Sequence, residues 1–140
     1  MTKSYEIIFE YIKDLSIEIP DAETFVFSRE QITKYKLGLN ITTKSLKNSM
    51  IEVTTKLDYK DPNKNKRKCY FEISYATVIK IKNKELKKKE LEKLILCDLQ
   101  IEIYPKLERI FLDAIKKAGF PNLKLVNKVD FEKLYNQRLN

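Results

Sequence analysis

An alternation of apolar and polar residues constrains this chain most, because it repeats in four separate segments of the first half. A period of two is typical of strands with one buried and one solvated face. The segments are residues 5–19, 35–41, 51–59 and 69–81, and the first ends at Pro20. We therefore expect four antiparallel strands, of which the first is long or bulged. A turn at Asp61–Lys68 should join the last two.

Beyond residue 103 the apolar residues recur at helical spacing, which predicts a long helix. Its apolar face comprises Leu107, Ile110, Phe111, Ala114, Ile115 and Ala118. Pro105 suits the first turn of this helix. Gly119 followed by Pro121 marks its end, since glycine enters the left-handed cap at little cost.

A short last helix should follow an extended crossover at 120–129. Asp130 is its expected N-cap, and Phe131, Leu134 and Tyr135 share one face of it. For residues 85–103 the sequence does not decide between helix and strand. Leu91 and Leu94 fit the spacing of a helix, whereas Leu99, Ile101 and Ile103 alternate as in a strand.

These elements predict an α+β fold, a four-stranded antiparallel sheet with a long and a short C-terminal helix packed on one face. The chain has 140 residues, of which 43% are hydrophobic, a size that suits one domain over 1–140. No apolar run approaches the roughly 20 residues that cross a bilayer, and the start at Met1 lacks a signal-peptide pattern. We expect a cytosolic protein.

The residues that most catalytic and metal sites need are scarce. The chain contains no histidine, and its two cysteines, Cys69 and Cys97, are far apart in the sequence. A zinc site or a redox dithiol lacks its minimum parts, and no glycine-rich phosphate loop or nucleophile motif occurs. We expect no metal, no cofactor and no catalytic residues, hence a protein that is not an enzyme.

The net charge of +8 raises a nucleic-acid hypothesis. Almost all of the excess is lysine, whereas recognition of bases and phosphates favours the planar arginine side chain, of which the chain has only Arg29, Arg67, Arg109 and Arg138. The densest basic tract, 63–68, belongs to the expected turn. A basic nucleic-acid-binding module remains the alternative from another class, and its affinity should fall steeply with salt.

Two stretches near opposite ends resemble signature segments of the bacterial protein-export chaperone family, SecB. They read Tyr11-Ile-Lys-Asp-Leu-Ser-Ile-Glu-Ile-Pro-Asp-Ala22 and Ala118-Gly-Phe-Pro-Asn-Leu-Lys-Leu-Val-Asn-Lys-Val-Asp-Phe-Glu-Lys-Leu-Tyr135. Between them, Tyr35-Lys-Leu-Gly-Leu resembles the family's V-K-L-D-L strand, Phe71-Glu-Ile its C-E-V and Tyr104-Pro its F-P. The resemblance covers nearly the whole chain and implies the same order of elements.

The resemblance also shows departures from the family pattern. Ala76-Thr77 stands where the family usually has Gly-Gly, the usual acidic tail is not found before Asn140, and family members are typically acidic. The family's acidic sheet surface receives the basic zinc-binding tail of the export motor SecA. The positions implied for that docking are Asp14, Glu18 and Glu72.

The resemblance implies an ATP-independent holdase that binds unfolded preproteins in hydrophobic grooves and assembles as a tetramer, a dimer of dimers. The implied client-binding residues are Phe25, Phe27, Tyr35, Leu37, Leu39, Phe120, Leu134 and Tyr135. Exposed aromatic surface left by a sheet with only two helices agrees with such a role, although any of these side chains also fits a core. Two roles stay open: general export with SecA, and a dedicated SecB-like chaperone of a toxin–antitoxin system.

Overall fold

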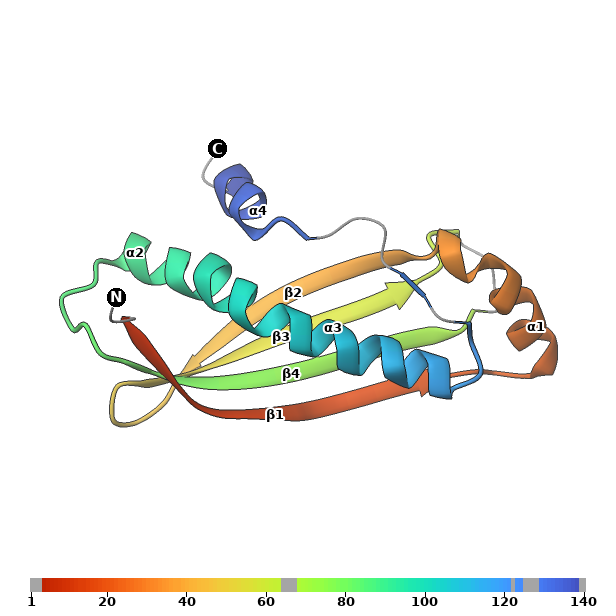
Figure 1. The fold of residues 1–140 in the computed structure, drawn as a ribbon, viewed down its shortest axis with the longest axis horizontal. Coiled ribbons are helices and arrows are strands. Elements are labelled where there is room, and N and C mark those ends of the chain that lie inside the picture. Colours follow the sequence, from red (N-terminus) through yellow and green to blue (C-terminus); the bar gives the residue numbers. More distant parts are fainter. Residues whose placement is uncertain (1–3, 64–67, 122, 125–128, 139–140) are drawn as a thin grey trace.

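The computed structural model describes residues 4–63, 68–121, 123–124 and 129–138. Four strands form one antiparallel sheet in the order β1-β4-β3-β2. They are β1 (Tyr5–Glu18), β2 (Lys36–Ser45), β3 (Met50–Lys60) and β4 (Tyr70–Ile81), with β1 and β2 at the edges (Figure 1). The pairing of β1 with β4 shifts twice, so the long first strand is bulged. The predicted strands are thus confirmed, although part of the turn at 61–68 lies outside the described residues.

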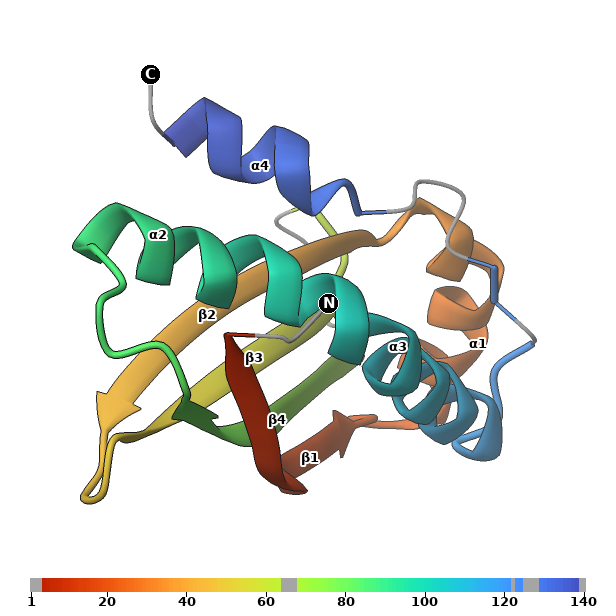
Figure 2. The ribbon, with the colours of Figure 1, turned by 60° about the vertical axis from the view of Figure 1, so that its left-hand side comes forward.

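The helices after β4 form one layer on one face of the sheet, as predicted. They are α2 (Lys88–Lys93), a π-helical segment (Leu94–Asp98), α3 (Leu99–Lys117) and α4 (Phe131–Arg138). The first three follow one another without a break and cross the sheet diagonally, and α4 packs against the π-helical segment (Figures 1 and 2). Residues 85–103, for which the sequence did not decide between helix and strand, are therefore mainly helical.

The interpretation of Pro105 as a first-turn residue is wrong, because α3 begins at Leu99 and the helical segment at Lys88. Pro105 lacks the N–H that would bond the Ile101 carbonyl, which normally weakens a helix. Here the buried residues Leu99, Ile103, Leu107, Phe111 and Ile115 recur every fourth position on both sides of the proline. Packing of this stripe on the sheet offsets the lost hydrogen bond.

A helix that the sequence did not predict, α1 (Ala22–Gln31), follows β1 and leads through a 3-10 turn (Ile32–Lys34) into β2. Asp21 caps it, because its Oδ1 accepts a hydrogen bond of 2.8 Å from the Thr24 amide. The buried residues of α1 are Thr24 and Ser28 rather than an apolar stripe. The sheet thus has a further helix at one end, beside the start of β2 (Figure 1).

The core lies between the sheet and α3. Val53, Leu57, Phe71, Ile73 and Ile79 of the two central strands are completely buried beneath the helical stripe. Burial of large apolar side chains contributes roughly 1.5–3 kcal/mol for each one. This layer therefore supplies most of the fold's stabilisation and places α3 over the central strands.

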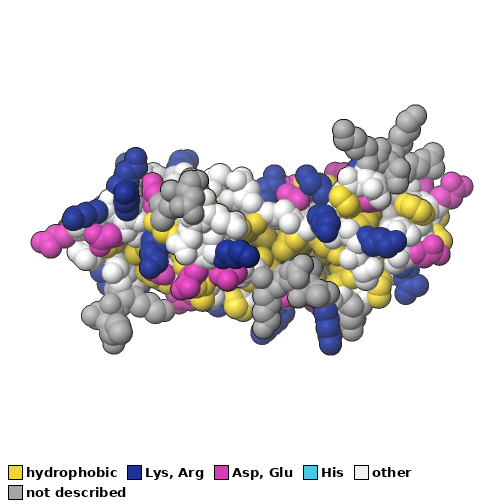
Figure 3. Space-filling model, turned by 90° about the horizontal axis from the view of Figure 1, so that it is seen from above, with side chains coloured by type: hydrophobic (Ala, Val, Ile, Leu, Met, Phe, Trp, Pro, Cys, Tyr) yellow, Lys and Arg dark blue, Asp and Glu magenta, His cyan; other side chains and the backbone are white. Residues whose placement is uncertain are grey.

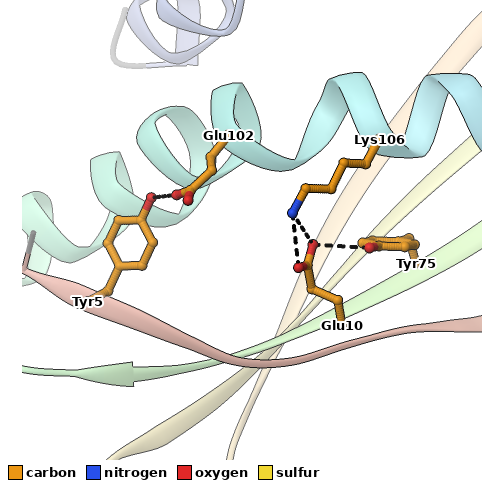
Figure 4. Close-up of polar contacts among 5 residues, drawn as sticks. All are labelled: Tyr5, Glu10, Tyr75, Glu102 and Lys106. Atoms are coloured by element: carbon orange, nitrogen blue, oxygen red, sulfur yellow. Dashed lines mark hydrogen bonds and ion pairs between the residues drawn. The ribbon is translucent and has the colours of Figure 1, made fainter.

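Polar contacts fix α3 across β1 and β4 (Figure 4). The ammonium group of Lys106 lies 3.0 Å from Oε2 of Glu10, and the Tyr75 hydroxyl donates a 3.0 Å hydrogen bond to Oε1 of the same carboxylate. The hydroxyl of Tyr5 donates to Glu102 further towards the start of α3. These contacts hold the edge strand β1 to the helix layer.

Candidate functional site

A groove lies along the edge strand β2, on the side of the sheet that carries the helices, and has a volume of about 880 Å³. Tyr35, Leu37 and Leu39 line its β2 side, and Tyr59 of the neighbouring strand contributes to the floor. Its opposite wall is formed by Leu123, Val129 and Leu134, from the crossover and α4. Figure 3 shows a band of hydrophobic side chains on this face, with Lys and Arg side chains around it.

The groove exists because the helix layer does not cover β2 as it covers the central strands. Leu37 pairs with Tyr59 and Leu39 with Leu57, so these leucines belong to the core-facing side of the sheet. They are nevertheless only half-buried, and Leu134 on α4 is 45% exposed. Apolar side chains from two walls therefore remain accessible in the folded chain.

A smaller hollow of about 170 Å³ continues the groove along β2 towards the π-helical segment. It shares Leu39 and Leu134 with the main groove. Its other lining residues are Asn40, Ile41, Leu96, Phe131 and Tyr135. The two hollows together form one channel, which we call the β2 groove.

The tyrosines in the floor have partners for their hydroxyl groups. Tyr35 donates a 3.1 Å hydrogen bond to Ser28 Oγ of α1, and Tyr59 donates a 2.6 Å hydrogen bond to the Ile32 carbonyl. Their rings lie 5.5 Å apart between centroids. Burial raises the pKa of both phenols, so the floor stays uncharged at neutral pH. The floor is thus an uncharged aromatic surface whose two hydroxyl groups are hydrogen-bonded within the chain.

Phe120 lies in the core, where it is 3% exposed and its ring packs 5.2 Å from Phe71 and 5.1 Å from Phe25. Phe27 projects from α1 as an exposed side chain and lines a separate shallow hollow with Val26. The structure therefore brings five of the eight predicted client-binding residues to the β2 groove. They are Tyr35, Leu37, Leu39, Leu134 and Tyr135.

Among the described residues, no group of three or more His, Cys, Asp and Glu side chains could hold a metal ion. Both cysteines are buried and unbonded, and burial raises the pKa of each thiol. Within the described part of the chain, no helix has the length and hydrophobicity needed to span a membrane. The β2 groove is therefore the main candidate site on the described part of the chain.

Comparison with known proteins identifies the family. The sequence model of the SecB family, described as preprotein translocase subunit SecB, matches residues 1–140. The chain belongs to the SecB family. A protein of Pelagibacter ubique (strain HTCC1062), provisionally named protein-export protein SecB, is 47% identical over 140 residues, which is 100% of both chains. The protein-export protein SecB of Rhodopseudomonas palustris (strain BisB18) is 32% identical over 133 residues, covering 95% of this chain and 79% of that protein.

A solved structure supports the same fold. The SecB-like chaperone of Mycobacterium tuberculosis, in complex with a peptide from an antitoxin, superposes with a TM-score of 0.66 and 14% sequence identity. The match covers 89% of this chain and 91% of that chain. The predicted SecB-like fold is confirmed, and so, at the level of the family, is the prediction of a protein-export chaperone. SecB is a chaperone family and not a family of enzymes.

The carboxylates implied for SecA docking lie on the sheet face opposite the helices. Asp14 pairs with Ser74 and Glu18 with Tyr70, and Glu72 stands between core-facing neighbours on β4. All three therefore point to the same solvated face. Glu72 is ion-paired with Lys56 and accepts a 2.9 Å hydrogen bond from the Tyr70 hydroxyl. The SecB chain thus presents its β2 groove and these carboxylates on opposite faces.

Several groove residues were not among the predicted site residues. They are Ile41, Tyr59, Leu96, Leu123, Val129 and Phe131, together with lysines at one end. Ile41 continues the alternation of Leu37 and Leu39, so that pattern could have identified it. Tyr59 reaches the groove through its pairing with Leu37, and Leu96 comes from the π-helical segment. Leu123, Val129 and Phe131 lie far from β2 in the sequence, and no local pattern shows that they meet it.

Proposed function

We propose that this SecB chain is an ATP-independent holdase that keeps non-native polypeptides from aggregating by binding them in the β2 groove. The observation that carries the proposal is the accessible apolar lining between β2 and α4, above all Leu37, Leu39 and Leu134. Folded chains seldom leave such a continuous apolar hollow open unless a partner covers it. Unfolded chains expose the matching apolar side chains.

Binding in this groove is driven by burial of the client's apolar side chains. Each large side chain that is fully buried contributes roughly 1.5–3 kcal/mol, and part of that gain offsets the lost freedom of the client chain. No precise arrangement of polar groups is required, so many sequences can bind with modest affinity. Release then needs no nucleotide, because a folding or translocating client withdraws its apolar segments from solution.

Assembly into a tetramer is the second part of the proposal. Ile12 and Leu15 of the edge strand β1, and Ile101 of α3, are exposed apolar side chains outside the groove. A partner chain would cover them, and several grooves in one assembly would bind one long client more tightly than a single groove. Light scattering coupled to size exclusion should give about four times the chain mass of 16.7 kDa. A strict monomer at micromolar concentration would contradict this part.

Delivery to SecA in the cytosol is the third part. It is supported by the outward carboxylates Asp14, Glu18 and Glu72 and by the full-length similarity to protein-export relatives. Replacing all three by lysine should abolish the calorimetric signal with the zinc-loaded SecA tail while leaving aggregation suppression intact. If the unmodified chain gives no signal, delivery to SecA fails and a dedicated chaperone role takes its place.

The holding activity itself is tested by diluting a denatured preprotein into buffer with the chain and following light scattering. Stoichiometric chaperone assembly should suppress aggregation without ATP. The Leu37→Asp and Leu39→Asp double variant should lose suppression, because it places charges in the groove. A matched double variant, Thr42→Asp and Thr54→Asp, changes paired positions on the opposite sheet face and should keep it. Equal activity of the two variants would overturn the groove as the binding site.

A further inference from the structure

One end of the β2 groove carries a cluster of lysines. Lys34 and Lys36 stand on either side of Tyr35 at the start of β2, and Lys124 and Lys133 come from the crossover and α4 on the opposite wall. All four are exposed. The two pairs are about 90 positions apart in the sequence, so only the fold brings them to one rim.

These four lysines keep their charge available. Within the part of the chain that the structure describes, the ion pairs do not include any of them. Among the described residues that line the groove, Asp130 is the only acidic one. Its Oδ1 accepts a 3.1 Å hydrogen bond from the Lys133 backbone amide, as the N-cap of α4. Its negative charge therefore interacts with the positive end of a helix. The rim has a clear excess of positive charge.

The other end of the groove is different. The hollow that continues along β2 is lined by apolar side chains and Asn40, with no charged residue among those described. From Lys36 to Ile41 the strand advances about 17 Å, at roughly 3.3 Å per residue. A bound segment of about five extended residues would thus reach from the lysine rim to the apolar end.

We propose that the β2 groove selects non-native segments in which acidic residues directly flank an apolar stretch. This inference rests on the proposed holdase function and names the client class that the groove prefers. The apolar stretch lies against Leu39, Ile41 and Phe131, and the acidic flank reaches the lysine rim. Segments flanked by basic residues are disfavoured, because their positive charges would approach the same cluster of lysines.

The expected preference is modest and sensitive to salt. Exposed charge pairs are weak individually, and a few of them acting together correspond to a preference of about five- to tenfold. Screening over about 10 Å at 0.1 M salt reduces this preference as salt rises. Salt does not screen the apolar contribution to binding. At high salt, the affinity for a peptide should therefore no longer depend on the charge of its flank.

The test compares peptides by calorimetry with the full chain. Three peptides share one short apolar stretch and carry a flank of Glu, of Gln or of Lys, and a fourth has the Glu flank with Ser in place of the apolar residues. The Glu-flanked apolar peptide should bind about five- to tenfold more tightly than the Lys-flanked one at low salt. The proposal would be overturned if the Glu-flanked and Lys-flanked peptides bound equally well. It would also be overturned if the Ser peptide bound as tightly as the Glu-flanked apolar peptide.

Matched variants separate the rim from overall charge. The rim variant replaces Lys34, Lys36, Lys124 and Lys133 by Gln. The control variant replaces by Gln four exposed lysines that do not line the groove: Lys80, Lys82, Lys84 and Lys116. Both variants lower the net charge of +8 by the same amount. The rim variant should lose the preference for Glu flanks, and the control should keep it. If both variants lost the preference for Glu flanks, the preference would arise from net charge, and its assignment to the lysine rim would be wrong.

Failure of this inference is distinguishable from failure of the proposed function. The Gln-flanked apolar peptide reports the apolar groove alone. If it binds and the flanks make no difference, the charge preference is wrong while the holdase proposal stands. If none of the apolar peptides binds at any salt concentration, both proposals fail.

Discussion

The ring of Phe25 on α1 packs directly over Gly119 at the end of α3. A Cβ atom on Gly119 would lie 3.0 Å from Cζ and 3.1 Å from Cε1 of that ring. Gly119 has a φ of +114°, and its amide donates a hydrogen bond to the Lys116 carbonyl while the Phe120 amide donates to Ile115. This pattern closes the helix end and directs the chain into the crossover. Only glycine combines that backbone conformation with room for the ring.

Gly119→Ala should therefore lower the free energy of unfolding by on the order of 1–2 kcal/mol, through backbone strain and the close contact with Phe25. Gly119→Val should cost at least as much. Urea unfolding followed by circular dichroism measures the change. In a Phe25→Ala background the same glycine substitution should cost less, because the ring contact is gone while the strain remains. An unchanged unfolding midpoint for Gly119→Ala would contradict this account of the helix end.

Stability should fall between about pH 10 and pH 12 because of Tyr75. Burial, and then the hydrogen bond to the Glu10 carboxylate, raises the pKa of Tyr75 to about 12 from its ordinary value of 10.0. The phenol loses its proton at lower pH in the unfolded chain than in the folded one. The stabilisation is thus complete below pH 10 and is lost as the pH rises through the folded pKa.

Tyr75→Phe should flatten the curve of unfolding free energy against pH in this window. Urea unfolding at several alkaline pH values measures it, and tyrosinate absorbance reports the ionisation directly. Buried Tyr5 and Tyr104 also have raised pKa values, so part of the alkaline loss should remain in the variant. An identical alkaline fall in both proteins would show that Tyr75 ionises as freely in the folded chain as in the unfolded one.

Asp130 should stabilise the α4 wall of the groove as its N-cap. Asp130→Ala should lower the stability of α4 by about 0.5–2 kcal/mol. The measurement is hydrogen exchange, which should become faster for the α4 amides. Asp130→Ser is the matched control, because a serine side chain can accept the same bond from the Lys133 amide. Equal protection of α4 in the Ala and Ser variants would mean that the cap does not hold this wall.

The alternation of residues was sufficient to predict the sheet, because its central strands have one fully buried face. Val53 and Leu57 on β3 and Phe71 and Ile73 on β4 are all completely buried. The end of α3 was also predictable, since Gly119 has a local conformational cause. The start of α3 was not, because Pro105 has the features of a first-turn residue and only packing on the sheet keeps the helix intact around it.

The unpredicted helix α1 shows a different limit. Phe25, Val26 and Phe27 are consecutive, so they cannot lie on one helical face. The face that is buried instead contains Thr24 and Ser28, and Ser28 is held there by the hydroxyl of Tyr35. A buried polar face depends on tertiary partners, which no local pattern reveals. The local signals for this helix are the Asp21 cap, Glu23 in the first turn and Arg29 in the last turn.

The candidate site was partly predictable for the same reason. The family resemblance implied Leu37, Leu39 and Leu134, while strand alternation and helical spacing predicted only that these side chains lie on the apolar face of their elements. Whether an apolar side chain is covered depends on which strand the long helix crosses, so the core position of Phe120 could not be separated from a groove position. The lysine rim combines two lysines from the first half of the chain with two from the second, so no local pattern reveals it.

The central claim is that non-native polypeptides are held in the β2 groove, and site-specific photo-crosslinking to a denatured preprotein tests it most directly. A photoreactive residue replaces Leu134 in the groove, which is 45% exposed, or Phe9, which is 62% exposed on the opposite sheet face. The account predicts strong crosslinking to the client from position 134 and little from position 9, although position 9 is the more accessible. Crosslinking from position 9 that equals or exceeds that from position 134 would contradict it.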